Sequence, residues 1–321
     1  MDEFNNQKLP IIVVAGPTAV GKTNTAIEIA LSIGGEIVSA DSMQIYRKLD
    51  IGTAKPTPSE REMIKHHLID IKDPSEKYTV FDFLTDAEKA VDDIVSRRKV
   101  PVICGGTGLY IDSLINGIKM LPQKENAVIR GRLSDEYDRD KEKLFDKLKT
   151  IDFEYFSKIH SNDKKRIVRA LELYEISGKN MTEHAAISKE KESSYNPLYI
   201  VLFCGDRDEL YKKTDERVEN MLRLGLVDEA KLVYDERKHF VTAAQAIGYK
   251  EFFPFFENIS SLDECVQILK KATRNYAKRQ MTWFRKNQSA VFIDSFQTNI
   301  EDIVNSVKEL WKNHMDFDRI S

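Results

Sequence analysis

The chain has 321 residues, with 49 basic and 52 acidic side chains and a formal net charge of −3 at neutral pH. This length allows one large domain or two smaller ones, each with a hydrophobic core. The near balance of charge excludes a globally basic protein, so any nucleic acid must contact a local basic surface. The three isolated cysteines, Cys104, Cys204 and Cys265, exclude a disulfide framework and a cysteine-rich zinc module.

The chain shows no sign of membrane insertion or export. No run approaches the roughly 18 apolar residues of a membrane span, and the start MDEFNNQKLP resembles neither a signal nor a transit peptide. We therefore expect a cytoplasmic protein with no membrane partner, and we expect it to be a monomer.

The first predicted strand and helix flank the loop VVAGPTAVGKT at residues 13–23. Ile11–Ala15 is a β-branched run typical of a buried strand, and Lys22–Ile33 has helical apolar spacing. The spacing matches a loop whose backbone amides and lysine surround a diphosphate, with a threonine hydroxyl on Mg²⁺, whereas an ordinary turn rarely has it. The helix N-terminus adds a dipole that favours an anion. The expected phosphate-binding residues are Gly16, Thr18, Ala19, Val20, Gly21, Lys22 and Thr23.

Two further strand ends are expected beside this loop. The predicted strand Glu36–Ala40 precedes Asp41, and Val100–Cys104 runs into GGTGLY, which contains Thr107. Because ligands of open parallel sheets gather at the carboxyl ends of the strands, Asp41 and Thr107 would converge on the phosphate loop. Asp41 is then either a base or a turn cap, and the glycine-rich segment either approaches a ligand or is a plain loop.

Residues from about 119 to 196 have no strand signal and are dense in charge, whereas strands return at Leu198–Cys204 and Ala290–Ile293. We therefore predict an α/β fold. A P-loop NTPase-like parallel sheet core is formed by residues 1–118 and 197–321, and residues 119–196 are inserted as an all-helical domain.

One helix of the predicted insert is well marked. Asn162 or Asp163 caps it, and Ser177-Gly178 ends it. One of its faces is a charged stripe, which is either solvated or binds phosphates. The apolar face has Ile167, Ala170, Leu171 and Tyr174, and the stripe has Lys165, Arg166 and Arg169.

A second helix is predicted within Lys270–Lys286, KKATRNYAKRQMTWFRK, which contains no acidic residue. Its basic side chains occupy about a third of the helical wheel, opposite its aromatic ones. This pattern favours contact with nucleic acid or phosphate over a membrane surface. The last helix, from Ile300 to Trp311, has the apolar spacing of a packing helix. The basic residues are Lys270, Lys271, Arg274, Lys278 and Arg285, and the aromatic ones are Tyr276, Trp283 and Phe284.

The phosphate loop alone leaves several functions open. One is an ATP-dependent kinase of a small molecule or nucleotide, with Asp41 as the base that deprotonates the acceptor. Another is a different reaction on a diphosphate, because the predicted strand VPVIC is followed by glycine, where many ATPases have an acidic Mg²⁺ ligand. A third is a non-enzymatic RNA-binding module that uses a nucleoside triphosphate as a switch.

Seven segments together resemble one family, the tRNA dimethylallyltransferases, in their order and spacing over about residues 11–295. Eukaryotic members often have a C-terminal zinc finger. This sequence shows none, so it resembles the bacterial type. The segments are GPTAVGKT, DSMQIY, IGTAKP, HHLID, GGTGLY, AIGYKE and RNYAKRQMTWFRK.

The resemblance implies a prenyl transfer. The loop would hold dimethylallyl diphosphate, with Mg²⁺ as cofactor at Thr23. Asp41 would be the general base for the exocyclic amine of the adenosine immediately 3′ of the anticodon, and pyrophosphate would be released. Lys22, Thr107 and Arg217 would stabilise the leaving diphosphate.

The resemblance also implies tRNA as partner, bound by its anticodon stem-loop, with the target adenosine flipped into a channel. The inserted domain would swing over the stem-loop. Met43 stands where the family commonly has arginine. For His66 and His67 we expect structural packing rather than metal binding. The expected tRNA-binding residues are Asp41, Ser42, Met43, Gln44, Lys165, Arg166, Arg169, Gln245, Gly248, Tyr249, Lys250, Lys278, Arg279 and Arg285.

Overall fold

The computed structural model describes residues 8–117, 126–188 and 193–317. The chain forms two compact units. The first is built from both ends of the chain, up to Ile115 and again from Ser194, and the second is Asn116–Ser193. The predicted boundary at 118/119 lies outside the described residues. The one at 196/197 falls inside a strand that begins at Tyr195, so the second unit ends slightly earlier than predicted.

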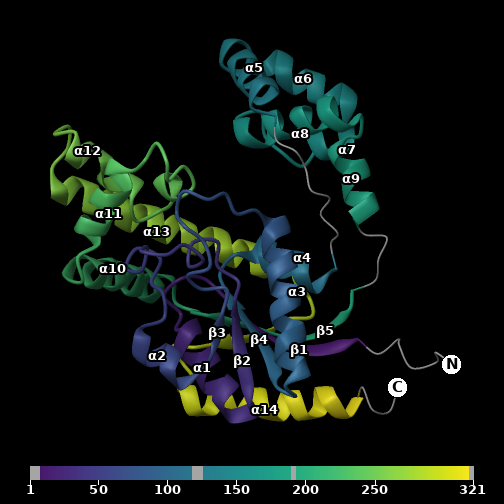
Figure 1. Ribbon diagram of the computed structural model, residues 1–321, viewed down its shortest axis with the longest axis vertical. Coiled ribbons are helices and arrows are strands. Elements are labelled where there is room, and N and C mark those ends of the chain that lie inside the picture. The colour runs from purple at the N-terminus through teal and green to yellow at the C-terminus, as the bar shows by residue number, and fades with distance from the viewer. Residues whose placement is uncertain (1–7, 118–125, 189–192, 318–321) are drawn as a thin grey trace. The chain divides into compact units, whose positions relative to one another are not determined.

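The first unit is built on a six-stranded sheet in which every strand pair is parallel (Figure 1). The predicted α/β class is therefore confirmed. The strand order is β3-β2-β4-β1-β5-β6, so the strand before the phosphate loop is central. Ile12 of this strand lies between Val102 and Leu198 of its neighbours. The strands are β1 (Leu9–Ala15), β2 (Gly35–Ser39), β3 (His66–His67), β4 (Val100–Gly105), β5 (Tyr195–Phe203) and β6 (Val291–Asp294).

Helices cover both faces of this sheet (Figure 1). α1 and α14 pack on one face, and α3 and α4 pack together against β2, β4 and β5 on the other. The helices are α1 (Lys22–Ile33), α2 (Pro58–Met63), α3 (Val80–Ser96), α4 (Gly108–Ile115), α10 (Arg207–Arg223), α11 (Leu226–Asp235), α12 (Phe253–Phe256), α13 (Leu262–Phe284) and α14 (Ile300–Phe317), with 3-10 turns η1 (Ala243–Gln245) and η2 (Lys250–Phe252).

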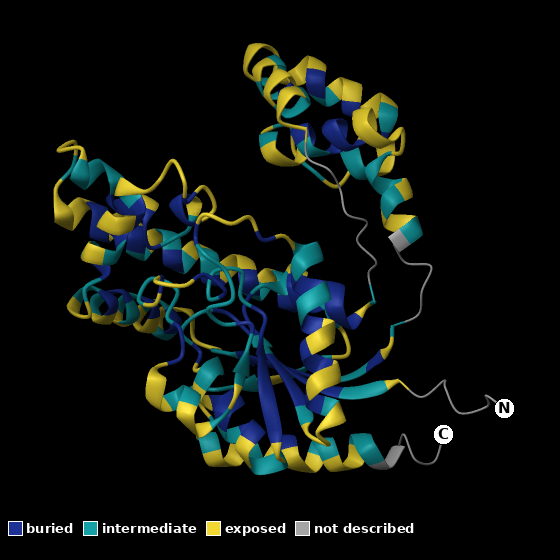
Figure 2. Ribbon diagram, in the orientation of Figure 1, coloured by how far each residue is buried: buried dark blue, intermediate teal, exposed yellow. Residues whose placement is uncertain are grey.

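The core explains why the strands are continuous apolar runs. Residues Ile11–Ala15 of β1 are all fully buried, as expected for a strand that is covered on both faces (Figure 2). Ile12 and Val14 point to the face where Ile303 and Val307 of α14 complete the core. The predicted packing role of the last helix is therefore confirmed.

Two element boundaries differ from the predictions for local physical reasons. α13 begins at Leu262, well before the predicted Lys270, because Ser261 and Glu264 form a capping box. The short strand β3 was not predicted, since two histidines are too short to show the alternating pattern of a strand.

The second unit contains only helices among its described residues and has a core of its own. The predicted helix is present as α8, capped by Asp163 and ended by Gly178. Its apolar face is rotated from the prediction, since Leu173 is buried while Tyr174 is 38% exposed. The helices are α5 (Ala127–Arg139), α6 (Lys141–Ile151), α7 (Phe153–Phe156), α8 (Lys164–Ser177) and α9 (Met181–Ser188).

In the part of the chain that the structure describes, no helix combines the length and the apolar character needed to cross a membrane.

Candidate active site

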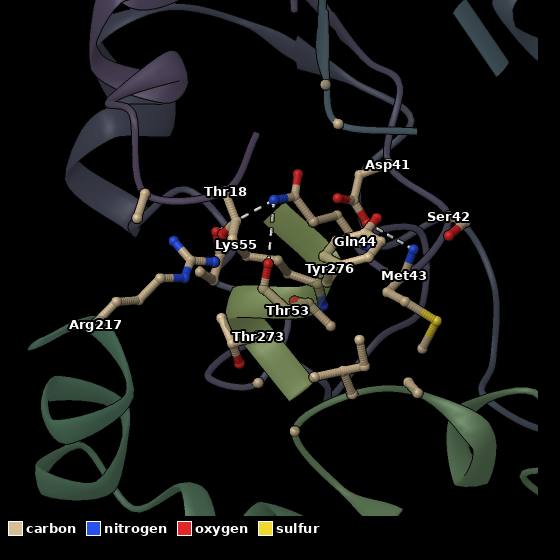
Figure 3. A pocket seen from close by; sticks show the side chains of 18 of the residues that line it. Thr18, Asp41, Ser42, Met43, Gln44, Thr53, Lys55, Arg217, Thr273 and Tyr276 are labelled. Carbon is tan, nitrogen blue, oxygen red and sulfur yellow. Dashed lines mark hydrogen bonds between the residues drawn. The ribbon is translucent and has the colours of Figure 1, made fainter. Parts of the chain in front are cut away.

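A cavity of about 710 Å³ opens at the carboxyl edge of the sheet (Figure 3). The loops that follow β1, β2 and β4 line one part of it, and side chains of α10 and α13 line another. Parallel strands deliver their carboxyl ends to one edge, which is why residues far apart in sequence meet here.

Most of the predicted phosphate loop lines this cavity, namely Thr18, Ala19, Gly21, Lys22 and Thr23. Gly16 and Val20 are not among the lining residues and have structural roles. Gly16 has a φ of 147°, and a Cβ there would lie 2.3 Å from the carbonyl oxygen of Leu202. Val20 is 2% exposed and belongs to the core.

Lys22 is held inside its own loop. Its Nζ donates a hydrogen bond to the carbonyl oxygen of Pro17 at 2.6 Å. The pKa of Lys22 is lowered to about 8, chiefly by burial and also by the nearby charge of Arg217, whereas Cys104 and Asp41 oppose this shift. An anion bound in the cavity would therefore stabilise the charged form of the lysine.

Asp41 follows β2 and lines the same cavity. Its Oδ1 accepts hydrogen bonds from the backbone amides of Met43, at 2.8 Å, and Gln44, at 3.3 Å. Its Oδ2 has no hydrogen-bond partner in the described ranges of the chain. Asp41 thus makes the turn contacts of a cap with one oxygen and leaves the other for a ligand.

Gln44, a predicted tRNA-binding residue, also lines the cavity, but both polar atoms of its side chain form hydrogen bonds within the protein. Its Nε2 donates to the carbonyl oxygens of Thr53 and Ala54, at 3.4 and 3.2 Å. Its Oε1 accepts from the hydroxyl of Ser39 at 3.0 Å. The amide therefore joins two loops of the cavity wall.

Thr107, predicted to face the diphosphate, is not among the lining residues. Its hydroxyl accepts from the backbone amide of Ser42 at 3.3 Å, and its own amide donates to the carbonyl oxygen of Ala40 at 3.3 Å. Gly105 permits this approach, because a Cβ there would lie 2.2 Å from the same oxygen. Thr107 therefore positions the segment that carries Asp41.

Arg217 projects from α10 into the cavity (Figure 3). Burial lowers the pKa of its guanidinium, and the charge of Asp41 counteracts this effect. α10 is fixed against α13 by two ion pairs, Asp215 with Arg274 at 2.7 Å and Glu219 with Lys270 at 2.5 Å. These pairs neutralise two side chains that the helical wheel had assigned to the basic face of α13.

The other predicted tRNA contacts are exposed cations, apart from Arg169, which pairs with a buried carboxylate; the exposed Arg166 also pairs with Asp163 at 3.3 Å. On α13, Lys278 and Arg279 are exposed, and Arg285 is exposed directly after its last residue. In the second unit, Arg169 pairs at 2.8 Å with Glu172, whose carboxylate is fully buried, so Arg169 has a structural task. Lys165 and Arg166 of the same stripe are exposed.

The segment from the end of η1 to the start of η2 forms a further part of the cavity lining and includes the predicted residues Gln245, Gly248, Tyr249 and Lys250. The ring of Tyr249 is fully buried against Gly52, where a Cβ would lie 2.6 Å from it. This contact explains why the loop at Gly52 requires a residue without a side chain.

Glu229 of α11 holds that loop and was not predicted. Its carboxylate accepts hydrogen bonds from the backbone amides of Asp50, Ile51 and Gly52 and from the hydroxyl of Tyr249, all between 2.8 and 2.9 Å. No local pattern in the sequence indicates this role, because the three loop amides lie 177 to 179 positions away and Tyr249 lies 20 positions away.

Lys55, in the same loop, was also missed. Its buried Nζ donates to the carbonyl oxygen of Tyr46, at 2.5 Å, and to the carboxylates of Asp50 and Asp70, at 2.7 and 2.6 Å. The lysine thereby fixes the loop in place.

α13 contributes Thr273, Tyr276 and Gln280 to the cavity, together with Leu269. These positions are three or four residues apart and therefore lie on one face of the helix, distinct from its basic face. This spacing is the signal in the sequence that could have identified them. Burial raises the pKa of Tyr276 to about 12, so its hydroxyl keeps its proton at neutral pH.

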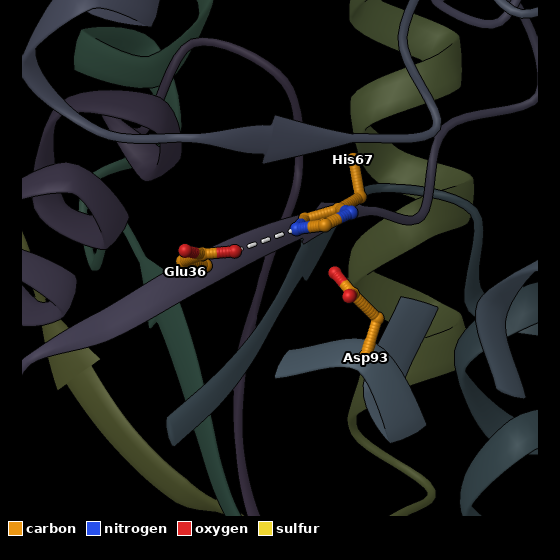
Figure 4. A group of neighbouring side chains, drawn as sticks. All are labelled: Glu36, His67 and Asp93. Carbon is orange, nitrogen blue, oxygen red and sulfur yellow. Dashed lines mark hydrogen bonds and ion pairs between the residues drawn. The ribbon is translucent and has the colours of Figure 1, made fainter. Parts of the chain in front are cut away.

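A second cluster, Glu36, His67 and Asp93, has metal-ligand residue types (Figure 4). His67 donates or accepts at 2.8 Å with Glu36, a carboxylate partner that the sequence did not reveal. Arg97 binds both oxygens of Glu36 and also pairs with Asp93 at 2.7 Å, while Lys99 reaches Glu36 at 2.8 Å. Arg97 above all holds the pKa of Glu36 well below its usual range. These contacts favour a structural ion cluster over a metal centre.

Comparisons with known proteins agree on one family. The model of the IPP transferase family matches residues 44–287. A tRNA dimethylallyltransferase of Bacillus subtilis (strain 168) is 41% identical over 292 residues, which cover 91% of this chain and 92% of the relative. Another, from Carboxydothermus hydrogenoformans, is 42% identical over 298 residues and covers 92% and 96%.

Solved structures are also similar. A full-length tRNA isopentenylpyrophosphate transferase of Bacillus halodurans has a TM-score of 0.72 and 37% identity, covering 98% of this chain and 100% of the other. A eukaryotic dimethylallyltransferase acting on tRNA has a TM-score of 0.75 and 29% identity, covering 91% of this chain and 75% of the other.

Proposed function

The chain belongs to the IPP transferase family of tRNA-modifying enzymes, and we propose that the cavity at the carboxyl edge of its sheet is where prenyl transfer occurs. The chain is a prenyltransferase that acts on tRNA, which confirms the resemblance seen in its motifs and disfavours the kinase alternative. Beyond this assignment, we propose the donor, the cofactor and the roles of individual residues.

We propose dimethylallyl diphosphate as the donor, bound by the phosphate loop. Lys22 and Arg217 face one cavity from β1–α1 and α10, so two cations can contact the diphosphate from two sides. The amides at the start of α1 add hydrogen-bond donors to the same anion. This charge stabilises the diphosphate as the bond from its oxygen to the allylic carbon breaks.

Asp41 is proposed as the general base. The exocyclic amine of adenine is a weak nucleophile, because its lone pair is delocalised into the ring. As nitrogen forms its bond to the allylic carbon, the C–O bond breaks with its electron pair on the diphosphate, and Oδ2 of Asp41 takes the amine proton. The Oδ1 contacts with Met43 and Gln44 hold the carboxylate in place for this step.

Mg²⁺ fits the donor set at Thr23. The hydroxyl of Thr23 lies in the first turn of α1 at the cavity wall, next to Lys22. Mg²⁺ commonly takes one or two protein oxygens and completes its shell with substrate phosphates and water. Thr23 would hold the ion, which would neutralise part of the diphosphate charge.

The acceptor is proposed to be the adenosine immediately 3′ of the anticodon, flipped out of its stack to reach Asp41. The exposed cations Lys278, Arg279 and Arg285 support phosphate contacts near the cavity, and Lys165 and Arg166 support contacts from the second unit. We propose that the second unit moves over the anticodon stem-loop and that the enzyme works as a cytoplasmic monomer.

The observation that carries this proposal is the meeting of Asp41 with Lys22 and Arg217 in one cavity. The test is incubation of the purified protein with labelled dimethylallyl diphosphate, Mg²⁺ and unmodified tRNA, followed by nuclease digestion. The proposal expects label in the nucleoside 3′ of the anticodon. A parallel reaction with ATP in place of the donor is the control, and ATP consumption without prenyl transfer would contradict the proposal.

A further inference from the structure

The carboxamide of Gln280 lies between two loops of the cavity. Its Oε1 accepts a hydrogen bond from the backbone amide of Thr18 in the phosphate loop, at 2.9 Å. Its Nε2 donates to the carbonyl oxygen of Gly106 in the loop after β4, also at 2.9 Å. The residue is 7% exposed. One buried side chain therefore connects two loops that belong to different strands.

Two glycines after β4, Gly106 and Gly108, leave room for side chains of α13. A Cβ on Gly106 would lie 2.3 Å from Nε2 of Gln280. One turn further along α13, the indole Nε1 of Trp283 donates to Asp112 at 2.7 Å, and a Cβ on Gly108 would lie 2.3 Å from the indole ring. α13 thus presents Gln280 from a fixed position.

The contact with Thr18 matters because of where that amide lies. Amides of a phosphate loop are the groups that such a loop turns toward its anion. Thr18 lines the cavity together with Ala19, Gly21 and Lys22, but its amide is committed to Gln280. The side chain therefore defines which part of the loop can turn toward a ligand before the ligand arrives.

We propose that Gln280 is a positioning residue of the donor site. It sets the conformation of the phosphate loop by holding Thr18 at a fixed position relative to Gly106. The inference rests on the proposed function for the identity of the donor, but the loop geometry concerns any diphosphate. Loss of the carboxamide leaves a buried amide and a buried carbonyl without partners, so the loop relaxes and the affinity for diphosphate falls.

The test compares Gln280→Met, which keeps the length of the side chain without its hydrogen bonds, with Gln280→Glu, which keeps only the acceptor. Gln267→Met is the matched control, because Gln267 is exposed on the same helix. Calorimetry with pyrophosphate and Mg²⁺ gives donor-site affinity without any prenyl chemistry, and steady-state kinetics with dimethylallyl diphosphate and tRNA give kcat and both KM values.

We expect pyrophosphate affinity to fall at least tenfold in Gln280→Met, and further in Gln280→Glu, whose added charge opposes the anion. KM for dimethylallyl diphosphate should rise in parallel, with KM for tRNA within twofold of the parent value. A lowered thermal midpoint with pyrophosphate affinity and both KM values within twofold of the parent would overturn the proposal, because the side chain would then be merely structural.

Gly106→Ala provides an independent variant, because its Cβ must displace the carboxamide. It should weaken pyrophosphate binding in the presence of Gln280, and the double change Gly106→Ala with Gln280→Ala should cost less than the sum of the single changes. Strict additivity would contradict the proposal. A parent protein that binds pyrophosphate but transfers no prenyl group would refute the proposed function alone, because the calorimetric comparison remains decisive for Gln280.

Discussion

Lys22 combines a cation with an environment that disfavours charge. Burial brings its pKa down to about 8, and Arg217 contributes in the same direction. The site is therefore prepared for a ligand of high negative charge, since only an anion compensates for the lost hydration of both cations.

This pKa predicts the pH dependence of donor binding. Below pH 8 the lysine is already protonated, so affinity should vary little. Above pH 8 the empty site loses the proton that the bound diphosphate requires, so the dissociation constant of dimethylallyl diphosphate should rise by about tenfold per pH unit. Calorimetry from pH 7 to 10 measures this, with Lys22→Gln as the control that binds weakly with a flat profile. A flat profile in the parent protein would contradict the role of Lys22.

At the residue scale, the sequence reveals groups whose position follows from a local rule. Lys22 and Thr23 could be predicted from the phosphate-loop pattern between β1 and α1, and Asp41 from its place just after β2, because the carboxyl ends of both strands face the site. Gln280 and Glu229 could not, since their contacts with Thr18 and Asp50 join segments far apart in the chain. Such contacts depend on how helices dock on the sheet, which hydrophobic spacing does not specify.

At the scale of elements, α13 has three faces with separate tasks. Lys270 and Arg274 pair with α10, Gln280 faces the cavity, and Lys278 and Arg285 lie toward solvent. The helical wheel predicted the aromatic and basic faces correctly in outline, but it could not show that α10 brings Asp215 and Glu219 to part of the basic face.

The exposed face should therefore carry the tRNA contacts. Lys278→Ala combined with Arg285→Ala should weaken tRNA binding and make the slope of log K against log salt shallower by about 0.7 to 0.9 per lost phosphate contact. Fluorescence titration at several salt concentrations measures the slope. Lys308→Ala with Lys312→Ala removes the same charge from the exposed face of α14 and serves as control. Equal effects of the two pairs would remove α13 from the interface.

Glu229 acts at the same scale, by joining α11 to the loop at residues 50–52. Glu229→Ala leaves three backbone amides without their acceptor, so the free energy of unfolding should fall by about 1 to 3 kcal/mol. Urea denaturation measures this. Glu236→Ala, an exposed change just beyond the same helix, is the control and should have little effect. Unchanged stability in Glu229→Ala would mean that water replaces the carboxylate without cost.

At the scale of the whole molecule, the chain combines a sheet-based unit with a helical unit that has its own core. The buried carboxylate of Glu172 is satisfied inside that unit by Arg130, Arg169 and the amide of Asn126. The composition of residues 119–196 predicted an all-helical segment, whereas its limits depend on where β5 begins to pair with β1, at Tyr195 with Leu9.

Because this core is self-contained, a fragment spanning residues 116–193 should fold alone. We expect a helical circular dichroism spectrum and a cooperative thermal transition. Leu171→Asp, which places a charge in the core, is the control and should abolish the transition. A fragment that lacks helix content in water would contradict an independent unit.

The central claim is that Asp41 and the phosphate loop serve one reaction in one cavity, and single-turnover transfer by Asp41→Asn tests it most directly. Asparagine preserves the Oδ1 acceptor for Met43 and Gln44 but removes the basic oxygen. With saturating dimethylallyl diphosphate, Mg²⁺ and anticodon stem-loop RNA, the account predicts a rate at least about a hundredfold below that of the parent protein, with RNA and donor affinities within a few-fold. A rate within a few-fold of the parent value would show that Asp41 is not the base.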